Sequence, residues 1–599
     1  MDRQYQNPFA VQTPEDINAS DVVNLFVEED TDFHKIPNPG HTFLNGARGS
    51  GKSMIFRYLE PDCQVLKLSR PVGELPYFAV YASIKNTSLN LTELARLENK
   101  HASLILNEHL LASYLAVKIF SSLVKAGIED EKGTYAAAFR SFYTGEFHKL
   151  LKRAGMYDDL PGLADTASLR ECFSPVMGLL ESVHLDTVSY LRRVSYKEEV
   201  VSYRGPLFGY LDFLLPLLKG VKCLPFMPRG PIFLLLDDAD NLNLTQTTVL
   251  NTWVSHRTGA DVSLKISTQL TYKTYRTVAG GRIDCPHDYS EINISDIYTS
   301  QKNNYMNRVR KIVEKRLAMH GCATDPEAMF PPDEEQEEKI RKIGDERRAK
   351  WETEGRGNRP SDDVVRYARP DYIASLKGTS KSGSTYSYAG FEQLVHLSSG
   401  VVRYFLEAAS QMYGHECGHG KDARVDRISP RTQNEVVRQL ANEFLYGEFE
   451  KMTKDVPEET QKLDIPKKLR NLITALGGMF HLALLDKGAS ERRYISFAFS
   501  DDPDREILDV LDLGIRFGYF HRSTIGTKEG TGRTPLYILS RRLAPHFLLD
   551  PTGFAAHKSA TSNRIREAMR APKRFLGRLE SQGIDKYLED VQLELYGEK

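Results

Sequence analysis

Apolar positions along the chain follow two alternating patterns. Residues 232–236 form an uninterrupted apolar run, and a shorter run lies within residues 41–46; both are typical of buried strands in a parallel sheet. Residues 109–128, 135–155 and 176–194 instead repeat apolar side chains every three or four positions, as amphipathic helices do. Strands that alternate with helices predict an α/β fold built on a parallel sheet.

The first short strand leads directly into GARGSGKS at residues 46–53, which has the spacing G-x-x-x-x-G-K-[ST]. Its three glycines allow the backbone to turn N–H groups toward a phosphate, and the following helix adds a partial positive charge. Lys52 is expected to reach the β- and γ-phosphates, and the Ser53 hydroxyl to bind Mg²⁺. The alternative is a chance match in a glycine-rich loop. The predicted ligands are ATP and Mg²⁺, and the predicted contacts are Gly46, Arg48, Gly49, Ser50, Gly51, Lys52, Ser53 and Met54.

The strand at residues 232–236 ends in two aspartates. One carboxylate at a strand tip can hold Mg²⁺, and the next can orient or deprotonate the attacking water. We assign Asp237 to Mg²⁺ and Asp238 to the water. Alone, the same sequence would also suit an Asp-rich turn that caps the next helix. Together with the glycine-rich loop it favours a nucleotide-hydrolysing site.

With these two motifs the chain resembles AAA+ ATPases, in the branch near the origin-recognition-complex initiators and the STAND switches. The resemblance implies a polar sensor 1 residue at the tip of the strand at residues 261–268, for which Thr268 is the first choice and Gln269 the second. It also implies an arginine finger, with Arg276 and Arg282 as candidates. A finger acts on a neighbouring subunit, so this role requires an oligomer; a solvated surface arginine is the alternative for each.

Further along, residues 303–321 resemble the helix that begins the AAA+ lid, and residues 394–410 resemble the sensor 2 helix, in which Arg403 occupies the position of the sensor arginine. A cation there would bind the γ-phosphate and couple the lid to the nucleotide state. The alternative is an arginine at a helix start that makes a surface ion pair.

The resemblance leaves long segments unexplained, and these define the predicted domain organisation. Residues 325–388 are rich in charge and small polar residues without an apolar stripe, so we expect a mobile, partly disordered excursion within the lid. The predicted parts are residues 1–94 (first part of the AAA+ core), 95–225 (helical insertion), 226–300 (second part of the core), 301–450 (helical lid), 451–555 (winged helix) and 556–599 (basic helical tail).

The last third reads as helix, strand, helix and two strands around a glycine-rich loop, which predicts a winged helix. Two partners stay open for it. The loop and its flanks are basic and suit the phosphates of double-stranded DNA, whereas the helix before them is acidic and suits a protein partner. The basic residues are Arg522, Lys528, Arg533, Arg541 and Arg542, and the acidic ones are Asp501, Asp502, Asp504, Glu506, Asp509 and Asp512.

Residues 415–419 spell H-E-C-G-H, the pattern of a helical zinc-protease site. Glycines at positions 414, 418 and 420 argue for a helix end, because each costs about 1 kcal/mol in a helix interior. We therefore expect a loop after the sensor 2 helix and no zinc.

Composition indicates the cellular compartment of the protein and limits where a DNA site could lie, but it does not indicate the function. The net charge is -1, so any DNA site must be a local patch, and the six cysteines include no C-x-x-C pair, which favours reduced thiols in the cytoplasm. The N-terminal residues lack the apolar stretch of a signal peptide, and no apolar run is long enough to predict a membrane span.

The sequence thus predicts an ATP-hydrolysing AAA+ switch or machine that works as a homo-oligomer or with an effector protein and acts on DNA or on that partner. The resemblance further implies a role in phage defence or mobile-element biology. The alternative is a STAND-like scaffold that hydrolyses ATP slowly and recruits a separate effector; Asp238, where most AAA+ members have Glu, favours it somewhat.

Overall fold

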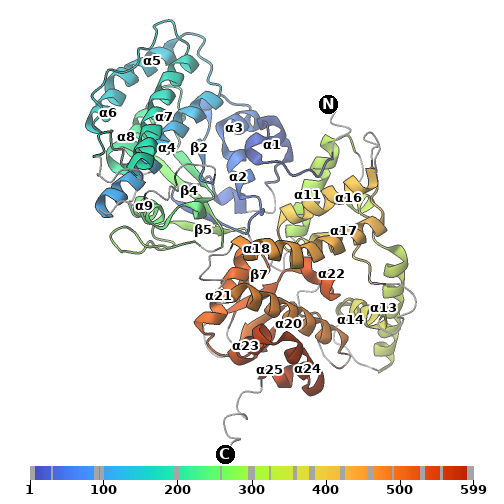
Figure 1. Cartoon of the computed structure of the whole chain (residues 1–599). Coiled ribbons are helices and arrows are strands. Elements are labelled where there is room, and N and C mark those ends of the chain that lie inside the picture. The colour runs from blue at the N-terminus through green and yellow to red at the C-terminus, as the bar shows by residue number, and fades with distance from the viewer. Residues whose placement is uncertain are drawn as a thin grey trace, which may run out of the picture. The chain divides into compact units, whose positions relative to one another are not determined.

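The computed structural model divides the chain into two compact units, which are coloured blue to green and yellow-green to red in Figure 1. We call residues 12–295 the core unit, and residues 1–11 with 296–599 the C-terminal unit. The structure describes residues 7–28, 32–85, 89, 94, 100–194, 202–256, 260–270, 272–294, 304–322, 325–354, 360–376, 385–417, 425–455, 464–486, 488, 491–526, 533–552 and 557–589.

A parallel sheet of five strands lies at the centre of the core unit, in the order β2-β3-β4-β1-β5. The strands β1, β3 and β4 are buried along their whole length, as the apolar runs predict for β1 and β3. The predicted α/β fold with a parallel sheet is therefore confirmed. The strands are β1 (Thr42–Asn45), β2 (Phe78–Ser83), β3 (Ile232–Asp237), β4 (Val262–Thr268) and β5 (Ser290–Asn293).

Helices cover both faces of this sheet (Figure 1). Parallel strands are joined by right-handed crossovers, so α2 and α3, which lead from β1 to β2, lie on one face, while the connections from β2 to β3 and from β3 to β4 lie on the other. The helices are α1 (Ala19–Leu25), α2 (Lys52–Leu59), α3 (Pro61–Leu68), α4 (Lys100–Lys125), α5 (Thr134–Phe142), α6 (His148–Arg153), α7 (Leu169–Val194), α8 (Leu215–Lys222) and α9 (Leu244–Ser255).

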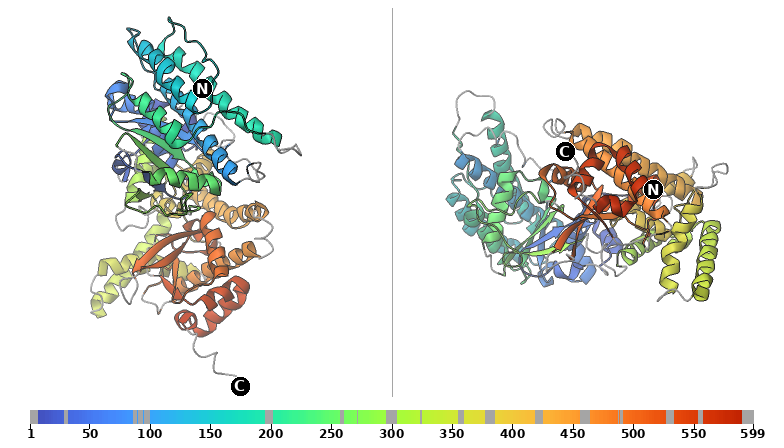
Figure 2. Two further views of the ribbon diagram at one scale, coloured as in Figure 1. Left: turned by 90° about the vertical axis from the view of Figure 1, so that its left-hand side faces the viewer. Right: turned by 90° about the horizontal axis from the view of Figure 1, so that it is seen from below.

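The predicted helical insertion corresponds to α4–α8, which form a bundle beside the sheet (Figure 2). Its apolar side chains share one core with the sheet strands, and α4 contacts β2, α7 and α9. The Tyr114 hydroxyl in α4 donates to the carbonyl oxygen of Ser83 at the end of β2, at 2.7 Å. The insertion is thus built into the core unit and is not an appended domain.

One helix of the described residues, Ala102–Lys125 within α4, is long and apolar enough to cross a membrane by length and composition alone. Buried residues make up 61% of its most apolar window, and Leu110, Leu115 and Phe120 lie fully inside the core. This burial accounts for the apolar character of the helix.

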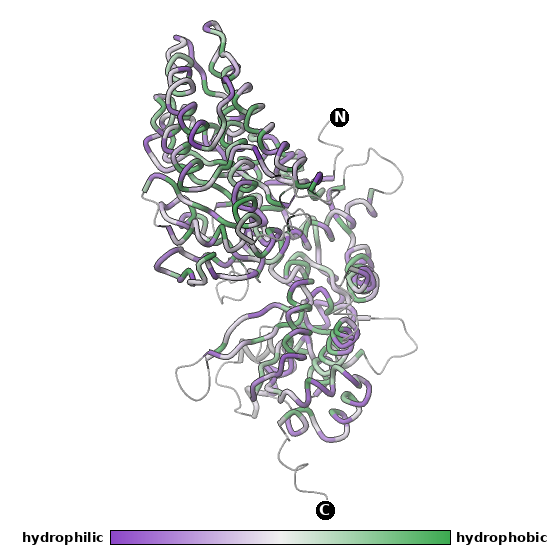
Figure 3. Tube along the Cα trace, turned by 60° about the vertical axis from the view of Figure 1, so that its left-hand side comes forward, coloured by the Kyte–Doolittle hydropathy of each residue, from purple (hydrophilic) through white to green (hydrophobic). Residues whose placement is uncertain are grey.

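The C-terminal unit packs its helices and a second sheet around one apolar core. Hydrophilic and hydrophobic positions alternate along its helices (Figure 3), which places one face of each in that core. The helices are α11 (Asn304–Met319), α12 (Pro326–Met329), α13 (Glu334–Glu354), α14 (Pro360–Leu376), α15 (Phe391–Leu397), α16 (Val402–Cys417), α17 (Pro430–Asn442), α18 (Phe449–Asp455), α20 (Ile465–Leu485), α21 (Arg505–Arg516), α22 (Ala544–Phe547), α23 (Ser562–Arg570), α24 (Pro572–Gln582) and α25 (Ile584–Glu589).

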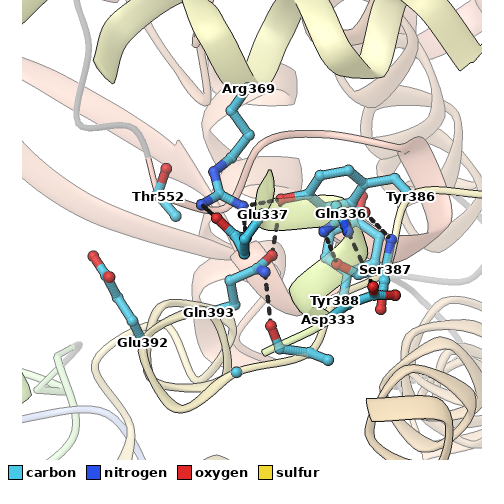
Figure 4. Close-up of polar contacts among 12 residues, drawn as sticks. Asp333, Gln336, Glu337, Arg369, Tyr386, Ser387, Tyr388, Glu392, Gln393 and Thr552 are labelled. Carbon is cyan, nitrogen blue, oxygen red and sulfur yellow. Dashed lines mark hydrogen bonds and ion pairs between the residues drawn. The ribbon is translucent and has the colours of Figure 1, made fainter. Parts of the chain in front are cut away.

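The prediction of a mobile excursion at residues 325–388 is wrong for the residues that the structure describes, because α13 and α14 pack against each other there. A few apolar side chains, including Ile340 and Tyr372, enter the core. A polar network adds to them (Figure 4): the Arg369 guanidinium donates to Glu337 at 3.0 Å and to the Tyr386 hydroxyl at 2.7 Å. The two helices bury few apolar side chains and are joined by ion pairs such as that between Arg369 and Glu337, so their sequence shows no continuous row of apolar residues.

The second sheet has the order β7-β8-β6-β9. Strands β6, β8 and β7 are antiparallel, and together with α20 and α21 they follow the predicted order of helix, strand, helix and hairpin. The hairpin loop, with Lys528, lies outside the described residues. The strands are β6 (Ser496–Phe499), β7 (Phe520–Gly526), β8 (Arg533–Leu539) and β9 (Lys558–Ala560).

The predicted basic tail is part of this module, because β9 pairs with β6 and α23 packs against α20. Its arginines also pair with the acidic helix α21: Arg566 with Asp504, and Arg570 with Glu506 at 3.3 Å. Part of the acidic charge at α21 is therefore neutralised within the unit.

The lid helices and the C-terminal module also join directly. The Tyr388 hydroxyl lies 3.0 Å from the carbonyl oxygen of Ala544 and 2.9 Å from that of Leu549, and the Arg541 amide donates to Ser399 Oγ at 2.6 Å. The predicted lid and winged-helix domains consequently share one core.

Candidate nucleotide-binding site

The loop at residues 46–51 joins β1 to α2 and requires its glycines. Gly49 and Gly51 have φ angles of +86° and +101°, a region that favours glycine. A Cβ atom on Gly46 would lie 2.8 Å from Ser50 Oγ, so a side chain there would force the loop to move. The Gly46 amide donates to the carbonyl oxygen of Thr268, which fixes the start of the loop to β4.

Donors of this loop are available to an anion. Within the described residues, the backbone amides of Gly49, Gly51 and Ser53 donate to no acceptor, and the buried Ser50 hydroxyl has no hydrogen-bond partner. These groups gather at the N-terminus of α2, where the helix carries a partial positive charge. Such an arrangement fits a phosphate group.

Lys52, the first residue of α2, is 5% exposed. Its ammonium group donates to the carbonyl oxygens of Gly46 and Ala47, at 2.8 and 3.2 Å. The ammonium group of the lysine is therefore held against the start of the loop, so its positive charge is available to phosphates bound by the loop. Arg48, also predicted as a contact, is exposed at the loop surface, and Met54 is half-buried in α2.

Asp237 ends β3 and is 1% exposed. One of its carboxylate oxygens accepts from the Ser267 hydroxyl and from the Asp238 amide (3.1 Å), and the other accepts from the Tyr81 hydroxyl at 3.0 Å. Mg²⁺ prefers hard oxygen ligands, so the Asp237 carboxylate and the Ser53 hydroxyl are suitable donors for it.

Asp238 stands directly after β3 in the left-handed region, with φ of 56°. Its amide donates to Ser267 Oγ at 2.9 Å, which fixes the turn to β4. Burial raises the pKa of the Asp238 carboxyl, the neighbouring Asp237 raises it further, and the positive charge of Lys52 opposes both. A raised pKa makes this carboxylate a better proton acceptor.

The sequence profile of the ORC-CDC6-like family matches residues 7–352 and 334–558. The chain belongs to the ORC-CDC6-like family. The resemblance to origin-recognition-complex AAA+ ATPases is thereby confirmed.

Two solved structures are matched along most of this ORC-CDC6-like chain. The Orc1 protein of Aeropyrum pernix in complex with DNA is 12% identical, with 93% of this chain and 98% of that chain covered and a TM-score of 0.27. The Orc2 protein of Aeropyrum pernix (ADPNP–ADP complexes) is 10% identical, with 96% and 98% covered and a TM-score of 0.31. No curated protein matches the chain.

The two sensor 1 candidates of this ORC-CDC6-like core lie in different surroundings. Thr268 is fully buried, and its hydroxyl lies 2.7 Å from Asn45 Oδ1 and 2.8 Å from the Gln269 carbonyl oxygen, so it supports the end of β1. The Gln269 side chain donates to Asp240 at 2.8 Å, just beyond the paired aspartates. Their sensor roles stay predictions.

Both arginine-finger candidates lie on an exposed hairpin between β4 and β5. Arg276 and Arg282 face each other across it, and Arg282 is 3.8 Å from Asp284. This exposure suits a group that reaches another subunit, but the role stays a prediction. Arg403, the sensor 2 candidate, is exposed in the first turn of α16 in the C-terminal unit, and its role also stays a prediction.

The histidine pattern at residues 415–419 falls at the end of α16. Glu416 accepts a hydrogen bond from the Ser429 amide at 2.8 Å, and His419 lies outside the described residues. Among the residues that the structure describes, no group of three or more His, Cys, Asp or Glu side chains could hold a metal ion. The expected loop is wrong for residues 415–417, because α16 includes Gly414 and continues to Cys417, and residues 418–420 lie outside the described residues.

Two residues of the site escaped the sequence analysis. Ser267 bridges Asp237 and Asp238, and Tyr81 donates to Asp237 from the neighbouring strand β2. Ser267 could have been found as the polar residue directly before the sensor 1 candidate Thr268 at the end of β4. Tyr81 carries no such signal, because tyrosine is common in strands.

Proposed function

We propose that the chain is an ATP-dependent molecular switch that binds ATP with Mg²⁺ and hydrolyses it. The observation that supports this is the meeting of a loop with unused amide donors, a buried lysine and two strand-tip aspartates at the same edge of one sheet. The influence of Lys52 on the pKa of the Asp238 carboxyl supports a site in which the cation and the candidate base act on the same space.

Each residue of the site has a distinct role in this proposal. The loop amides and Lys52 bind the β- and γ-phosphates, and Asp238 orients the attacking water and accepts its proton. Mg²⁺, held by Ser53 and Asp237, would neutralise phosphate charge. Ser267 helps to hold both aspartates in position, because its hydroxyl donates to the Asp237 carboxylate and accepts from the Asp238 amide.

Nucleotide binding is tested by Lys52→Ala, with ADP affinity measured by calorimetry. We expect the affinity to fall by at least about 100-fold, because the phosphates lose a buried cation. Lys67→Ala serves as a matched control and should bind ADP as the parent does. Lys67 lies in α3, is half-exposed and pairs with Glu28. Normal ADP affinity in Lys52→Ala would refute the proposed site.

Hydrolysis is tested by Asp238→Asn. ADP and ATP affinity should stay within about threefold of the parent, while turnover falls by about 100-fold or more, since the water loses its polarising carboxylate. Asp158→Asn, in an exposed loop of the insertion, is the control for removal of one negative charge. A parent that turns over at the rate of Asp238→Asn would favour the slow STAND-like scaffold instead.

We further propose double-stranded DNA as the partner of the β7–β8 hairpin. Arg522 and Arg533 are exposed on its two strands, and part of the acidic charge of α21 is already paired with α23. Changing both arginines to Glu should lower the slope of log affinity against log salt by about 0.9 for each phosphate that the protein no longer neutralises. DNA affinity that is absent from the parent at physiological salt, with and without ATP, would leave a protein partner as the alternative.

The role of a homo-oligomer is part of the same proposal. A finger arginine must reach the site of another copy, so Arg276→Ala and Arg282→Ala should slow turnover without weakening ATP binding. A mass measurement with ATP bound tests whether the chain assembles.

A further inference from the structure

The Tyr81 hydroxyl lies between two carboxylates. It is 2.7 Å from Glu15 Oε1 and 3.0 Å from Asp237 Oδ2. Tyr81 belongs to β2, and Glu15 belongs to a single turn of 3-10 helix, Pro14–Asp16, that precedes α1. The Mg²⁺ candidate Asp237 is therefore connected to the N-terminal part of the core unit through one phenol group.

A phenol carries one hydrogen, so Tyr81 can donate to only one of these carboxylates at a time. Burial, with Asp237 and Glu15 beside it, raises the pKa of Tyr81 far above its ordinary value, so the hydroxyl keeps its proton. The other two donors to Asp237 are held in place, because the Asp238 amide is part of the backbone and Ser267 also accepts from that amide. Tyr81 is the donor that has a second acceptor within reach.

Glu15 lies in a segment that connects both units, and we call residues 7–17 the strap. Its first residues are fixed in the C-terminal unit: the Asn7 side chain donates to the Ser410 carbonyl oxygen at 2.8 Å, and Phe9 is fully buried against Tyr413. Ser410 and Tyr413 belong to α16, the helix that begins with Val402 and carries Arg403.

The other end of the strap is fixed in the core unit. Ile17 is buried, and its carbonyl oxygen accepts from Arg57 in α2 at 3.4 Å. Thr13, directly before the turn with Glu15, is extended. The chain from Phe9 to Pro14 can span at most about 18 Å, so a displacement of α16 beyond this reach would pull on the turn that holds Glu15.

We infer that Tyr81 and Glu15 are positioning residues that control how Asp237 is presented to Mg²⁺, and that the strap couples this control to α16. In one state Tyr81 donates to Asp237 and occupies its Oδ2. In the other state Tyr81 donates to Glu15, and that oxygen of Asp237 is released. The inference rests on the proposed function, since it gives that site a link to the lid helix.

The switch is tested with Glu15→Gln in the full chain. An amide accepts a hydrogen bond less strongly than a carboxylate, so Tyr81 should donate more to Asp237. The Mg²⁺ concentration that gives half-maximal thermal stabilisation of the ADP-bound protein should rise by about threefold to tenfold. Asp16→Asn, which removes the same charge one residue away, is the matched control and should give a smaller shift.

The decisive comparison uses the Tyr81→Phe background. There Glu15→Gln should no longer change the Mg²⁺ requirement, because the shared hydroxyl is gone. An equal shift with and without Tyr81, an equal shift in Asp16→Asn, or no shift in Glu15→Gln would overturn the switch.

The strap is tested with Asn7→Ala, which removes the hydrogen bond to α16. It should change the Mg²⁺ requirement in the parent and leave it unchanged in Tyr81→Phe. An Asn7→Ala chain with the parent's Mg²⁺ requirement would overturn the coupling to α16. These outcomes are separate from failure of the proposed function, which would appear as ADP binding that survives Lys52→Ala.

Discussion

The two inserted regions of this protein are held in place by different forces. The insertion formed by α4–α8 buries continuous apolar faces against the sheet, and its aromatic residues, such as Phe120, Phe139 and Phe173, pack ring against ring. The insertion formed by α13 and α14 contributes few apolar side chains to its core and relies on ion pairs. The α4–α8 insertion is part of the apolar core of its unit, whereas the α13–α14 insertion is attached to its unit largely by ion pairs.

This difference explains why only one insertion was predicted as folded. Apolar periodicity is a local signal, so the helices of the first insertion can be read from the sequence. The second depends on partners far along the chain, since Asp371 in α14 pairs with both Arg347 and the buried Arg492, 121 residues away. A charged segment can be well packed when its partners are supplied by another part of the fold.

The largest effect is expected from Phe120→Ala, which tests the apolar insertion. Phe120 is fully buried and lies within 6.4 Å of three other phenylalanine rings, so its removal should cost about 3 to 5 kcal/mol of unfolding free energy. Urea unfolding of the core unit measures this. The control Leu211→Ala, at a position that is 54% exposed, should change stability by less than about 0.5 kcal/mol.

Next in size is Arg369→Ala, which tests the charged insertion. Removing Arg369 leaves Glu337 without its ion pair, while the Tyr386 hydroxyl keeps its hydrogen bond to Gln393; the cost should be about 2 to 3 kcal/mol because the ion pair is only partly buried. The destabilisation should appear in unfolding of the C-terminal unit, with that of the core unit unchanged. Arg341→Ala, which breaks an exposed pair with Glu338, should cost under about 0.5 kcal/mol; an equal destabilisation in both variants would contradict the idea that the network holds the insertion.

Acid should weaken the apolar insertion through His109. Its Nδ1 accepts from the Phe208 amide at 2.8 Å, and burial lowers its pKa to about 3. Between this value and the unfolded pKa near 6.5 the unfolded chain binds more protons, so stability falls as the pH falls. The decrease should be about 2 kcal/mol between pH 6.5 and pH 5. In His109→Gln that part of the pH dependence should disappear; a parent whose core unit is equally stable at both pH values would contradict the assignment.

The smallest effect is expected from Lys125→Met, which breaks the ion pair between the end of α4 and the site helix α2. The Lys125 ammonium group lies 2.8 Å from the Glu60 carboxylate. In the variant, Glu60 would still have its second ion pair, with Arg57 at 3.3 Å. Stability should fall by about 1 kcal/mol or less, because the lysine is half-exposed. ADP affinity by calorimetry should stay within about twofold, and a larger change would mean that the insertion also controls the site.

Much of the site could be predicted because its main parts are short, continuous motifs. Lys52, Ser53, Asp237 and Asp238 each follow or end a strand whose burial is visible in the sequence. Tyr81 could not be predicted, because it meets Asp237 across 156 residues of chain and depends on the register between β2 and β3. The roles of Thr268, Arg282 and Arg403 stay predictions for a related reason: they depend on how nucleotide, subunits and lid come together.

The unit boundary at residue 11 has a consequence for synthesis of the protein. Residues 7–10 belong to a core whose other members follow hundreds of residues later, and the hydrogen bond between Asn7 and Ser410 joins positions 403 apart. At ribosomal rates of about 5 to 20 residues per second, Phe9 must wait roughly 20 to 80 seconds for Tyr413. During that interval the apolar side chain of Phe9 lacks the core that buries it in the finished protein.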